Sequence, residues 1–427
     1  MTAKRVVVIG AGIVGVSSAL WLQRAGHEVV LVDRLGIGEA TSQGNAGVVA
    51  CCAIVPVTEP ALLRKLPGYL FGSDGPLFVR WSYLPRLLPF LAPMLCQATP
   101  ARAARAARGL VPLLADAAEQ HEALAAGSGA ERWLKRSDYL FAYADREAFE
   151  ADAFAWDQRR EHGFRWEEIE GPAVRELEPA LSPELTFLAR VGNHATVTDP
   201  GRYVKALGDH FISQGGAART LDVTGLRSER GRIVAVETDE GEIACDAAVI
   251  AAGAWSARLT ARLGFRLPLE SERGYHIEFG DSNVAPKSPI AIVSGKFVAT
   301  GMEGRLRCAG LVEFAGLDAP QSDAPLAFLE REAHRAFPGL KYGGLYHWMG
   351  HRPLSIDSLP FIGEVPRVAG AYCAFGHQHI GLTAGPKTGR LIAELVSGRT
   401  PNLDLAPYRV GRFSRRDWMS GSATERR

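Results

Sequence analysis

The sequence predicts a mixed α/β and α+β fold, in which a domain built on a parallel sheet is interrupted by a second domain built on an antiparallel sheet. Three observations support this prediction. A strand–helix–strand unit opens the chain, another buried strand follows at residues 247–251, and short alternating strands occupy residues 270–315. The 427 residues, 47% of them hydrophobic, are enough for two or three domains.

The first unit is complete within the N-terminal residues. Residues 6–9 form a continuous β-branched run, which is typical of a buried parallel strand. Residues 16–25 have the composition of a helix, which we expect to end at Gly26. Residues 28–33 then provide the second strand, so the segment predicts a βαβ unit.

A Gly-x-Gly-x-x-Gly motif joins the first strand to the helix. We expect Gly10 to make the tight turn, Gly12 to let the backbone approach a pyrophosphate, and Gly15 to allow close packing of helix and strand. The motif is weak when it occurs alone. Here it lies between a clear strand and a clear helix, which favours a nucleotide-binding function.

The residues that follow these glycines strengthen the prediction. The N-terminus of the helix, at Ile13 and Val14, offers unpaired N–H groups and a positive dipole to phosphates. Asp33 ends the next strand 18 positions after Gly15, where its carboxylate can accept hydrogen bonds from a ribose. Together these features predict a bound dinucleotide.

A small polar loop, residues 41–47, follows soon after the second strand. Its sequence is Thr-Ser-Gln-Gly-Asn-Ala-Gly. Such a loop can pass close to a flavin and donate hydrogen bonds along its phosphates and ring edge, which favours FAD over NAD. The alternative is an ordinary surface turn.

The region from residue 60 to residue 135 is rich in Leu, Ala and Arg and is predicted to be helical. Within it, residues 81–95 are mostly apolar with few charges. Two interpretations stay open for this segment. It is either a helix packed on the core or a surface that meets a membrane or an electron acceptor.

Composition excludes several classes of function. The net charge of +1 gives no indication of a nucleic-acid partner. The six cysteines form no Cys-x-x-Cys pair, so we expect reduced thiols in a cytoplasmic protein, and no spacing of His, Cys or carboxylates predicts a metal site. We find no signal peptide and no run of ~18 apolar residues, so no transmembrane helix is expected.

Four motifs resemble the FAD-dependent D-amino acid oxidase/dehydrogenase superfamily, with the bacterial D-amino acid dehydrogenases as the most similar branch. They lie at residues 7–33, 41–47, 249–256 and 351–383, and the last set, which begins His-Arg-Pro, is the most specific. The string Glu-Arg-Gly-Tyr-His at residues 272–276 is also similar to relatives that act on hydroxyproline-like imino acids.

This resemblance implies a Rossmann-like FAD-binding domain with an inserted antiparallel-sheet substrate domain. The expected parts are the FAD-binding domain at residues 1–80, 186–265 and 346–412, a helical and substrate-domain segment at 81–185, a substrate-domain sheet at 266–345, and a polar tail at 413–427.

The resemblance also implies which residues hold FAD. We expect the ADP half, the flavin and the linking phosphates to contact Gly10, Gly12, Ile13, Val14, Gly15, Asp33, Arg34, Ser42, Asn45, Ala46, Gly47, Val223, Gly253, Trp255, Gly363, Gly381, Leu382 and Thr383. Some relatives attach their flavin through a cysteine near the position of His351. No cysteine is present there, so we expect non-covalent FAD.

Three residues are candidates for the substrate site. Arg352 lies where relatives hold the substrate carboxylate, which a guanidinium binds through two parallel hydrogen bonds. Tyr275 is expected to donate to the same carboxylate, and His276 to contact the substrate or the flavin. The alternatives are a structural ion pair for the arginine and packed sheet residues for the other two. His377 and His379 flank the flavin loop, and a structural role is the alternative for each.

We therefore expect oxidation of a D-amino acid or cyclic imino acid, of the D-proline or hydroxy-D-proline type, by hydride transfer from its α-carbon to flavin N5. The partners expected are this substrate and a quinone-type or protein electron acceptor, with peripheral association at the inner membrane as one option. Three alternatives remain: an oxidase that uses O2, a flavin subunit of a hetero-oligomeric amino-acid or opine dehydrogenase, and an NAD-dependent dehydrogenase.

Overall fold

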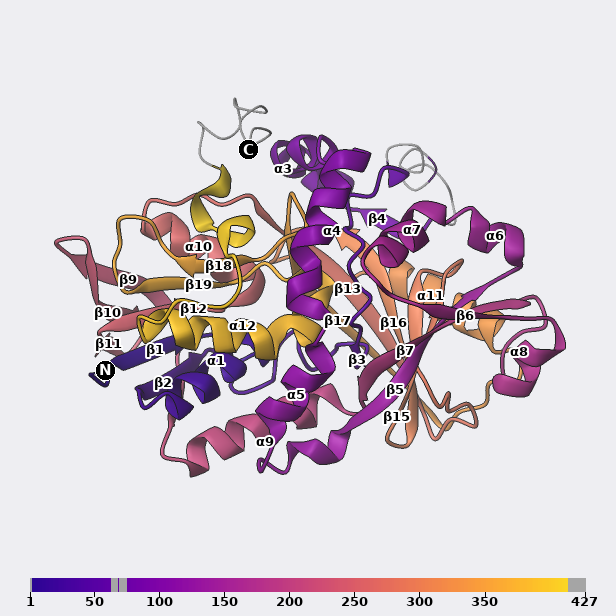
Figure 1. Ribbon diagram of the computed structural model, residues 1–427, viewed down its shortest axis with the longest axis horizontal. Helices are drawn as coiled ribbons and strands as arrows, with labels where there is room; N and C mark the ends of the chain where they lie inside the picture. The colour runs from indigo at the N-terminus through magenta and orange to yellow at the C-terminus, as the bar shows by residue number, and fades with distance from the viewer. Residues whose placement is uncertain (1, 63–67, 69–74, 414–427) are drawn as a thin grey trace.

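The computed structural model describes residues 2–62, 68 and 75–413, so all but the first residue of the expected polar tail lies outside the described residues. Two sheets lie side by side in the molecule, one on each side of a central group of helices (Figure 1). Segments from the beginning, middle and end of the chain meet in each sheet, so neither sheet corresponds to one continuous stretch of sequence.

The first sheet has six strands and is parallel except at one edge. Its strands, in spatial order, are β18 (Phe361–Glu364), β19 (Ala371–Phe375), β12 (Ala247–Ile250), β1 (Arg5–Ile9), β2 (Glu28–Asp33) and β8 (Ala217–Thr220). The central strands are apolar and buried on both faces, as a covered parallel sheet requires.

Helices cover one face of this sheet, and a small sheet and a helix cover the other. The helical face consists of α1 (Ile13–Arg24), α9 (Pro200–Ser213) and α12 (Gly381–Val396), with α4 (Pro100–Leu114) and α5 (Ala117–Ala125) beside them. The opposite face carries β9 (Val223–Glu229), β10 (Arg232–Thr238), β11 (Gly241–Ala244) and α10 (Ser256–Arg262).

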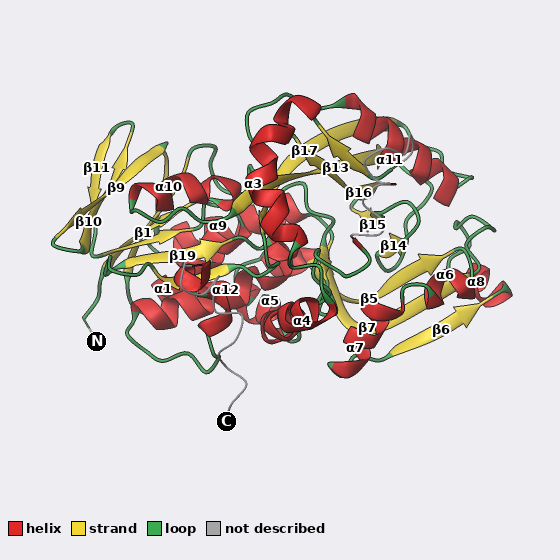
Figure 2. Cartoon of the chain, turned by 90° about the horizontal axis from the view of Figure 1, so that it is seen from above, coloured by secondary structure: helices red, strands yellow, loops and turns green. Residues whose placement is uncertain are grey.

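The second sheet is mostly antiparallel and is seen from above in Figure 2. Its strands, in spatial order, are β17 (Gly344–Ser355), β13 (Leu269–Gly280), β16 (Arg305–Phe314), β15 (Phe297–Met302), β14 (Ile290–Ile292), β5 (Leu134–Tyr143), β7 (Phe187–Val197) and β3 (Val48–Val49), with β4 (Leu77–Val79) on β16 and β6 (Trp166–Glu170) on β7.

Short helices complete the fold, and α11 packs on one face of the second sheet. These helices are α3 (Leu84–Leu95), α6 (Arg146–Glu150), α7 (Ala153–Glu161), α8 (Pro172–Leu177) and α11 (Asp323–Ala336), with 3-10 turns η1 (Trp81–Tyr83), η2 (Ala130–Trp133), η3 (Gly253–Trp255), η4 (Gln378–Ile380), η5 (Ala406–Tyr408) and η6 (Val410–Phe413).

Strands of the second sheet also lie in the segments expected to form the FAD-binding domain, among them β3 and β4 within residues 1–80. β7 follows the expected boundary at residue 185, and β17 crosses the one at residue 345, yet both belong to the second sheet. The reason is strand pairing: β7 pairs with β5, and β17 pairs with β13 along its whole length. The second sheet therefore takes more of the chain than we expected.

In the apolar segment at residues 81–95, one side of the helix packs on the core, and the role of its outer side stays a prediction. α3 buries Leu87, Phe90 and Met94 against the molecule, while Leu88 on its outer side is 51% exposed. No helix in the described part of the chain is long and apolar enough to cross a bilayer.

The glycine turn after β1 has the close packing that the motif predicts. Gly10 has φ +104°, and a Cβ there would lie 2.4 Å from the carbonyl oxygen of Ala251. A Cβ on Gly15 would lie 1.7 Å from the carbonyl oxygen of Gly10. Both positions therefore require glycine, because no side chain fits between β1, α1 and β12.

Candidate functional site

A cavity of about 980 Å³ extends from the first sheet to the second. It brings together most of the residues expected from the sequence. The expected residues that line it are Gly10, Gly12, Ile13, Val14, Asp33, Arg34, Ser42, Asn45, Ala46, Val223, Gly253, Trp255, Tyr275, Arg352, Gly381, Leu382 and Thr383.

Four expected residues lie outside the described lining: Gly15, Gly47, Gly363 and His276. Gly15 faces the turn carbonyl under the helix, and a Cβ on Gly47 would lie 2.4 Å from the carbonyl oxygen of Val197 on β7. Gly363 is on the edge strand β18. The contact of these three glycines with FAD therefore stays a prediction.

The N-terminus of α1 opens onto the cavity. Gly12 is the N-cap residue and has no side chain to cap the helix, and no acidic residue lies in the first turn. The hydroxyl of Ser42 accepts a hydrogen bond of 2.9 Å from the Ile13 N–H. This end of the helix can bind an anionic group because its positive dipole is not neutralised by a carboxylate.

The neighbouring end of the cavity combines a carboxylate with stacked aromatic and cationic groups. Asp33 accepts hydrogen bonds of 2.8 Å from the N–H groups of both Ala11 and Leu35, which fix its carboxylate at the end of β2. The guanidinium of Arg34 lies 4.2 Å from the ring centroid of Trp255. This arrangement suits a ribose and an adenine.

The loop at residues 43–46 is held by side chains of the second sheet. Each of its four backbone carbonyl groups accepts a hydrogen bond from that sheet. The donors are Arg307 to Gln43 and Asn45 (2.9 and 2.5 Å), His276 to Gly44 (3.0 Å) and Thr300 to Ala46 (2.8 Å). The loop therefore has a position that both sheets determine.

His276 has a structural position in this arrangement. Its ring stacks on Trp348, with centroids 5.0 Å apart, and its Nδ1 donates to Gly44. Burial, reinforced by Arg307, lowers the pKa of His276 to about 3, so the ring is neutral at physiological pH. The expected contact between this residue and a substrate is not supported by this geometry.

The hydroxyl of Tyr275 is also directed away from the expected partner. It donates a hydrogen bond of 2.5 Å to Glu313 and accepts one of 3.3 Å from the Ser322 N–H. Burial and the Glu313 carboxylate raise the pKa of Tyr275 to about 12. The tyrosine lines the cavity, but its hydroxyl is already occupied beside α11.

Arg352 lies on β17 with its guanidinium at the cavity. Its Nη1 donates to Glu272 and to the carbonyl of Leu311, both at 2.8 Å, and its Nη2 donates to the carbonyl of Gly310 at 3.2 Å. Gly274 provides the space, because a Cβ there would lie 2.4 Å from the guanidinium carbon. The arginine is thus in the cavity as expected and also in an ion pair.

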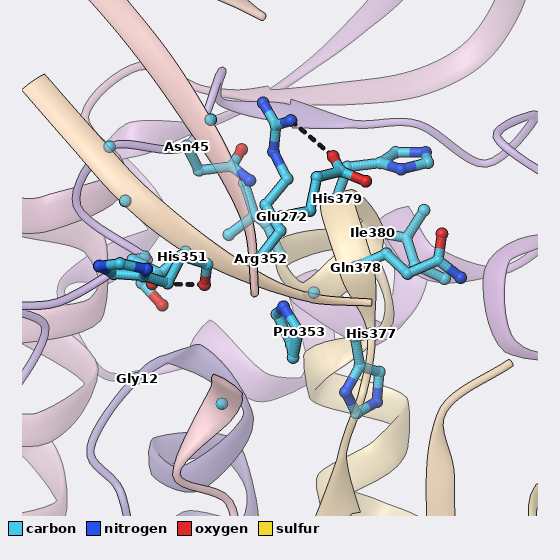
Figure 3. Close-up of a pocket in the computed structure, with 18 of the residues that line it drawn as sticks. Gly12, Asn45, Glu272, His351, Arg352, Pro353, His377, Gln378, His379 and Ile380 are labelled. Atoms are coloured by element: carbon cyan, nitrogen blue, oxygen red, sulfur yellow. Dashed lines mark hydrogen bonds and ion pairs between the residues drawn. The ribbon is translucent and has the colours of Figure 1, made fainter. Parts of the chain in front are cut away.

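The ion pair between Arg352 and Glu272 is drawn in Figure 3, with His379 beside it. Burial lowers the pKa of His379, with Glu272 and Arg352 acting on it in opposite directions. The ring of His377 lies below and hydrogen-bonds to Thr388 at 3.0 Å, which is the structural alternative considered for it. Both histidines line the cavity, with His377 buried and His379 exposed.

Sequence reasoning missed Glu272, Arg307 and Thr300. Glu272 is part of the string at residues 272–276, in which only Tyr275 and His276 were named as candidates, although strand alternation places it on the same face as Gly274. No signal in the sequence connects Arg307 or Thr300 with a loop more than 250 positions earlier.

The cavity fits an adenine dinucleotide that carries a ring system. The uncapped helix end suits its phosphates, Asp33 suits its ribose, and the space continues past the loop at residues 43–46 to the start of α12 and to Arg352. In the described residues, no cysteine lines this cavity.

Comparisons with known proteins agree with this fit. The family model described as "FAD dependent oxidoreductase" (DAO) matches residues 5–395. A D-amino-acid oxidase of Bradyrhizobium diazoefficiens is 40% identical, with 96% of this chain and 99% of the relative covered. A D-amino acid dehydrogenase of Cereibacter sphaeroides is 31% identical, with 96% and 95% covered. The crystal structure of glycine oxidase from Geobacillus kaustophilus aligns with a TM-score of 0.73 at 22% identity, over 96% of this chain and 99% of that one.

Proposed function

Because the chain belongs to the DAO family of FAD-dependent oxidoreductases, we propose that it oxidises a small D-amino acid or a cyclic imino acid of the D-proline or hydroxy-D-proline type. The observation that carries this proposal is Arg352 at the cavity. The printed names of the relatives above support the D-amino acid class. The string at residues 272–276 supports the cyclic imino acids.

We infer that Arg352 binds the substrate carboxylate. Its three hydrogen bonds use both Nη1 hydrogens and one Nη2 hydrogen, so Nε and the other Nη2 hydrogen have no partner among the described residues. These two nitrogens form the edge of a guanidinium that binds a carboxylate through parallel hydrogen bonds. The anchor fixes the direction of the α C–H bond.

The cavity beside Arg352 can exclude water from the reacting atoms. Leu311, Val312 and Phe314 on β16 contribute apolar surface there, and Pro353 follows the arginine on β17. FAD, when bound, accepts the two electrons released at the substrate α-carbon. The imine product of a primary amine then hydrolyses in water, whereas that of a proline stays cyclic.

The residues expected to bind FAD keep their roles in the proposal where they line the cavity. Gly12, Ile13 and Ser42 would hold the phosphates, Asp33 the ribose, and residues 381–383 the ring. We propose that FAD is not covalently attached, because no cysteine among the described residues lines the cavity. Acid precipitation should release all of the yellow colour into the supernatant, whereas a coloured pellet would contradict this.

The substitution Arg352→Ala tests the proposed function. We expect KM for D-alanine or D-proline to rise at least about a hundredfold, since two charge-assisted hydrogen bonds to the carboxylate are lost. The control is Arg335→Ala, an exposed arginine on α11 paired with Glu184, for which KM should not change. A flavin spectrum confirms loading of both variants. If KM is unchanged in Arg352→Ala, the anchor is elsewhere.

For the electron acceptor we propose a quinone-type or protein partner that meets the outer side of α3. Support comes from the exposed Leu88, and Trp81 at the start of this segment is 58% exposed. The same surface would allow peripheral membrane association. The name of the Bradyrhizobium relative supports oxygen instead. If the purified protein turns over at full rate with O2 and without a dye acceptor, it is an oxidase.

A hetero-oligomeric dehydrogenase remains the second candidate. In that case the isolated chain would bind FAD but oxidise D-amino acids only with its partner present. Gel filtration combined with activity of the purified chain separates this candidate from a self-sufficient enzyme.

A further inference from the structure

Glu272 places a buried carboxylate next to the proposed substrate anchor. It lies on β13 directly opposite Arg352 on β17, and its Oε1 accepts from the Arg352 Nη1 at 2.8 Å. The side chain of Glu272 is 4% exposed and that of Arg352 is 20% exposed, and both line the cavity. Burying a carboxylate destabilises the folded state unless its charge is compensated, so a functional role for Glu272 is worth considering.

The pair leaves room for a ligand without breaking. Glu272 accepts only from Nη1, Nη2 donates to the carbonyl of Gly310, and Nε has no hydrogen-bond partner among the described residues. A ligand carboxylate can therefore bind while Glu272 stays in place. Two carboxylates would then flank one guanidinium, which leaves a net negative charge in a site shielded from water.

The nearest charged and titratable side chains on β13 and β17 do not compensate this charge. The neighbouring Arg273 is on the opposite face of β13, where it pairs with Glu313. Burial lowers the pKa of His351 to about 4, so its ring is neutral at physiological pH. Lys296, whose carbonyl accepts from the Leu311 N–H, is a further cation in the cavity wall. A ligand that brings its own positive charge would restore the balance.

We propose that Glu272 determines specificity by binding the substrate's α-ammonium group, so that the site selects zwitterions over simple monocarboxylates and 2-hydroxy acids. The proposal rests on the proposed function, because it assumes that Arg352 binds the carboxylate. In an α-amino acid the two charges are joined through one carbon, which matches a cation and an anion placed side by side. A 2-hydroxy acid has the same shape but lacks the positive charge, so Glu272 repels it.

The test compares Glu272→Gln with the wild type, using D-alanine and propionate as probes. KM for D-alanine should rise about tenfold or more, because the ammonium loses its anionic partner. Propionate, followed by the change in flavin absorbance on titration, should bind about tenfold tighter or more, because the repulsion is gone. The opposite signs are the distinguishing result.

A structural role would give a different pattern. If Glu272 only holds the guanidinium in place, Glu272→Gln weakens both D-alanine and propionate, and that outcome, like no change in either, overturns the proposal. Glu272→Asp keeps the charge and should still reject propionate, which provides a second variant if the first binds FAD poorly. Glu270→Gln, a partly buried carboxylate two residues away that pairs with Tyr83, is the matched control.

Failure of the proposed function would look different again. If the wild type turns over none of the D-amino acids or prolines, the reaction assigned above is wrong. The propionate titration still measures, without turnover, whether Glu272 repels a ligand that carries only a carboxylate. The two ideas therefore fail separately.

Discussion

At the scale of single residues, the role of a charged side chain depends on the groups buried beside it as well as on the motif that contains it. Arg352 was predicted from its sequence setting, and the structure adds the glutamate that shares its guanidinium. This arginine is in an ion pair and also lines the cavity, so its role as the carboxylate anchor stays a prediction. Sequence can indicate the anchor, but only the pairing of β13 with β17 reveals its partner.

A second buried carboxylate, Glu178 at the end of α8, provides a prediction for stability. Burial raises the pKa of Glu178 to about 7, with Lys287 opposing the shift. Below the ordinary glutamate pKa the group is protonated in the folded and unfolded states alike. As the pH rises towards 7, only the unfolded state releases its proton, so the free energy of unfolding falls until the pH passes about 7.

The substitution Glu178→Gln should remove this fall in the free energy of unfolding. The variant is expected to be more stable than the wild type above neutral pH, by about 1–2 kcal/mol after screening, and equal to it near pH ~4. Urea unfolding at the two pH values measures the difference. Equal stabilities at pH ~8 would mean that the carboxyl group is hydrated in the folded protein.

At the scale of elements, local sequence patterns predicted single elements, but they did not predict which distant elements contact one another. The first βαβ unit was predicted because each element has its own periodicity and the glycine turn lies between them. The loop at residues 41–47 was predicted to approach the cofactor from its polar composition. Its support by Arg307 and Thr300 could not be predicted, because those side chains arrive from strands whose order the sequence does not encode locally.

His276 tests this interpretation of the loop. His276→Phe keeps an aromatic ring that can stack on Trp348 but leaves the Gly44 carbonyl without its donor. We expect weaker FAD binding, by about 1–3 kcal/mol for an unsatisfied buried group, and little change in KM for the amino acid once FAD is saturating. Fluorescence titration of the apoprotein with FAD and steady-state kinetics provide the two values.

The opposite result for His276→Phe would support the substrate contact first expected for His276. If FAD affinity is retained while KM for the amino acid rises, His276 contacts the substrate after all. Thr300→Val is the matched variant, since it removes the donor to the Ala46 carbonyl of the same loop and should also weaken FAD binding.

At the scale of the whole molecule, the expected division of the chain and the two sheets do not coincide. The expected pieces at residues 1–80, 186–265 and 346–412 contain all six strands of the first sheet. However, β3, β4, β7 and most of β17 also lie within them and belong to the second sheet. Composition could not distinguish these strands from strands of the first sheet. Which strands pair depends on how distant parts of the chain come together, and local sequence does not show this.

The cavity lies where a bound FAD would contact both sheets. Its lining comes from the turn after β1, from the loop held by the second sheet, and from β13, β16 and β17. One hydrophobic cluster lies within the second sheet and α11, while the cluster under the first sheet also includes Val49, Ala195 and Val197 of β3 and β7, so packing already joins the two sheets at that end. A ligand that contacts both should couple their unfolding.

We therefore expect removal of FAD to lower the melting temperature by several degrees, because a ligand at a hundred times its Kd stabilises the folded state by about 2.7 kcal/mol. ADP, which can fill only the end near Asp33 and the α1 N-terminus, should restore part of the loss. Differential scanning calorimetry of the holoprotein, the apoprotein and the apoprotein with ADP measures all three. An apoprotein that melts with the holoprotein, or full recovery with ADP alone, would mean that the flavin half of the ligand does not connect the two sheets.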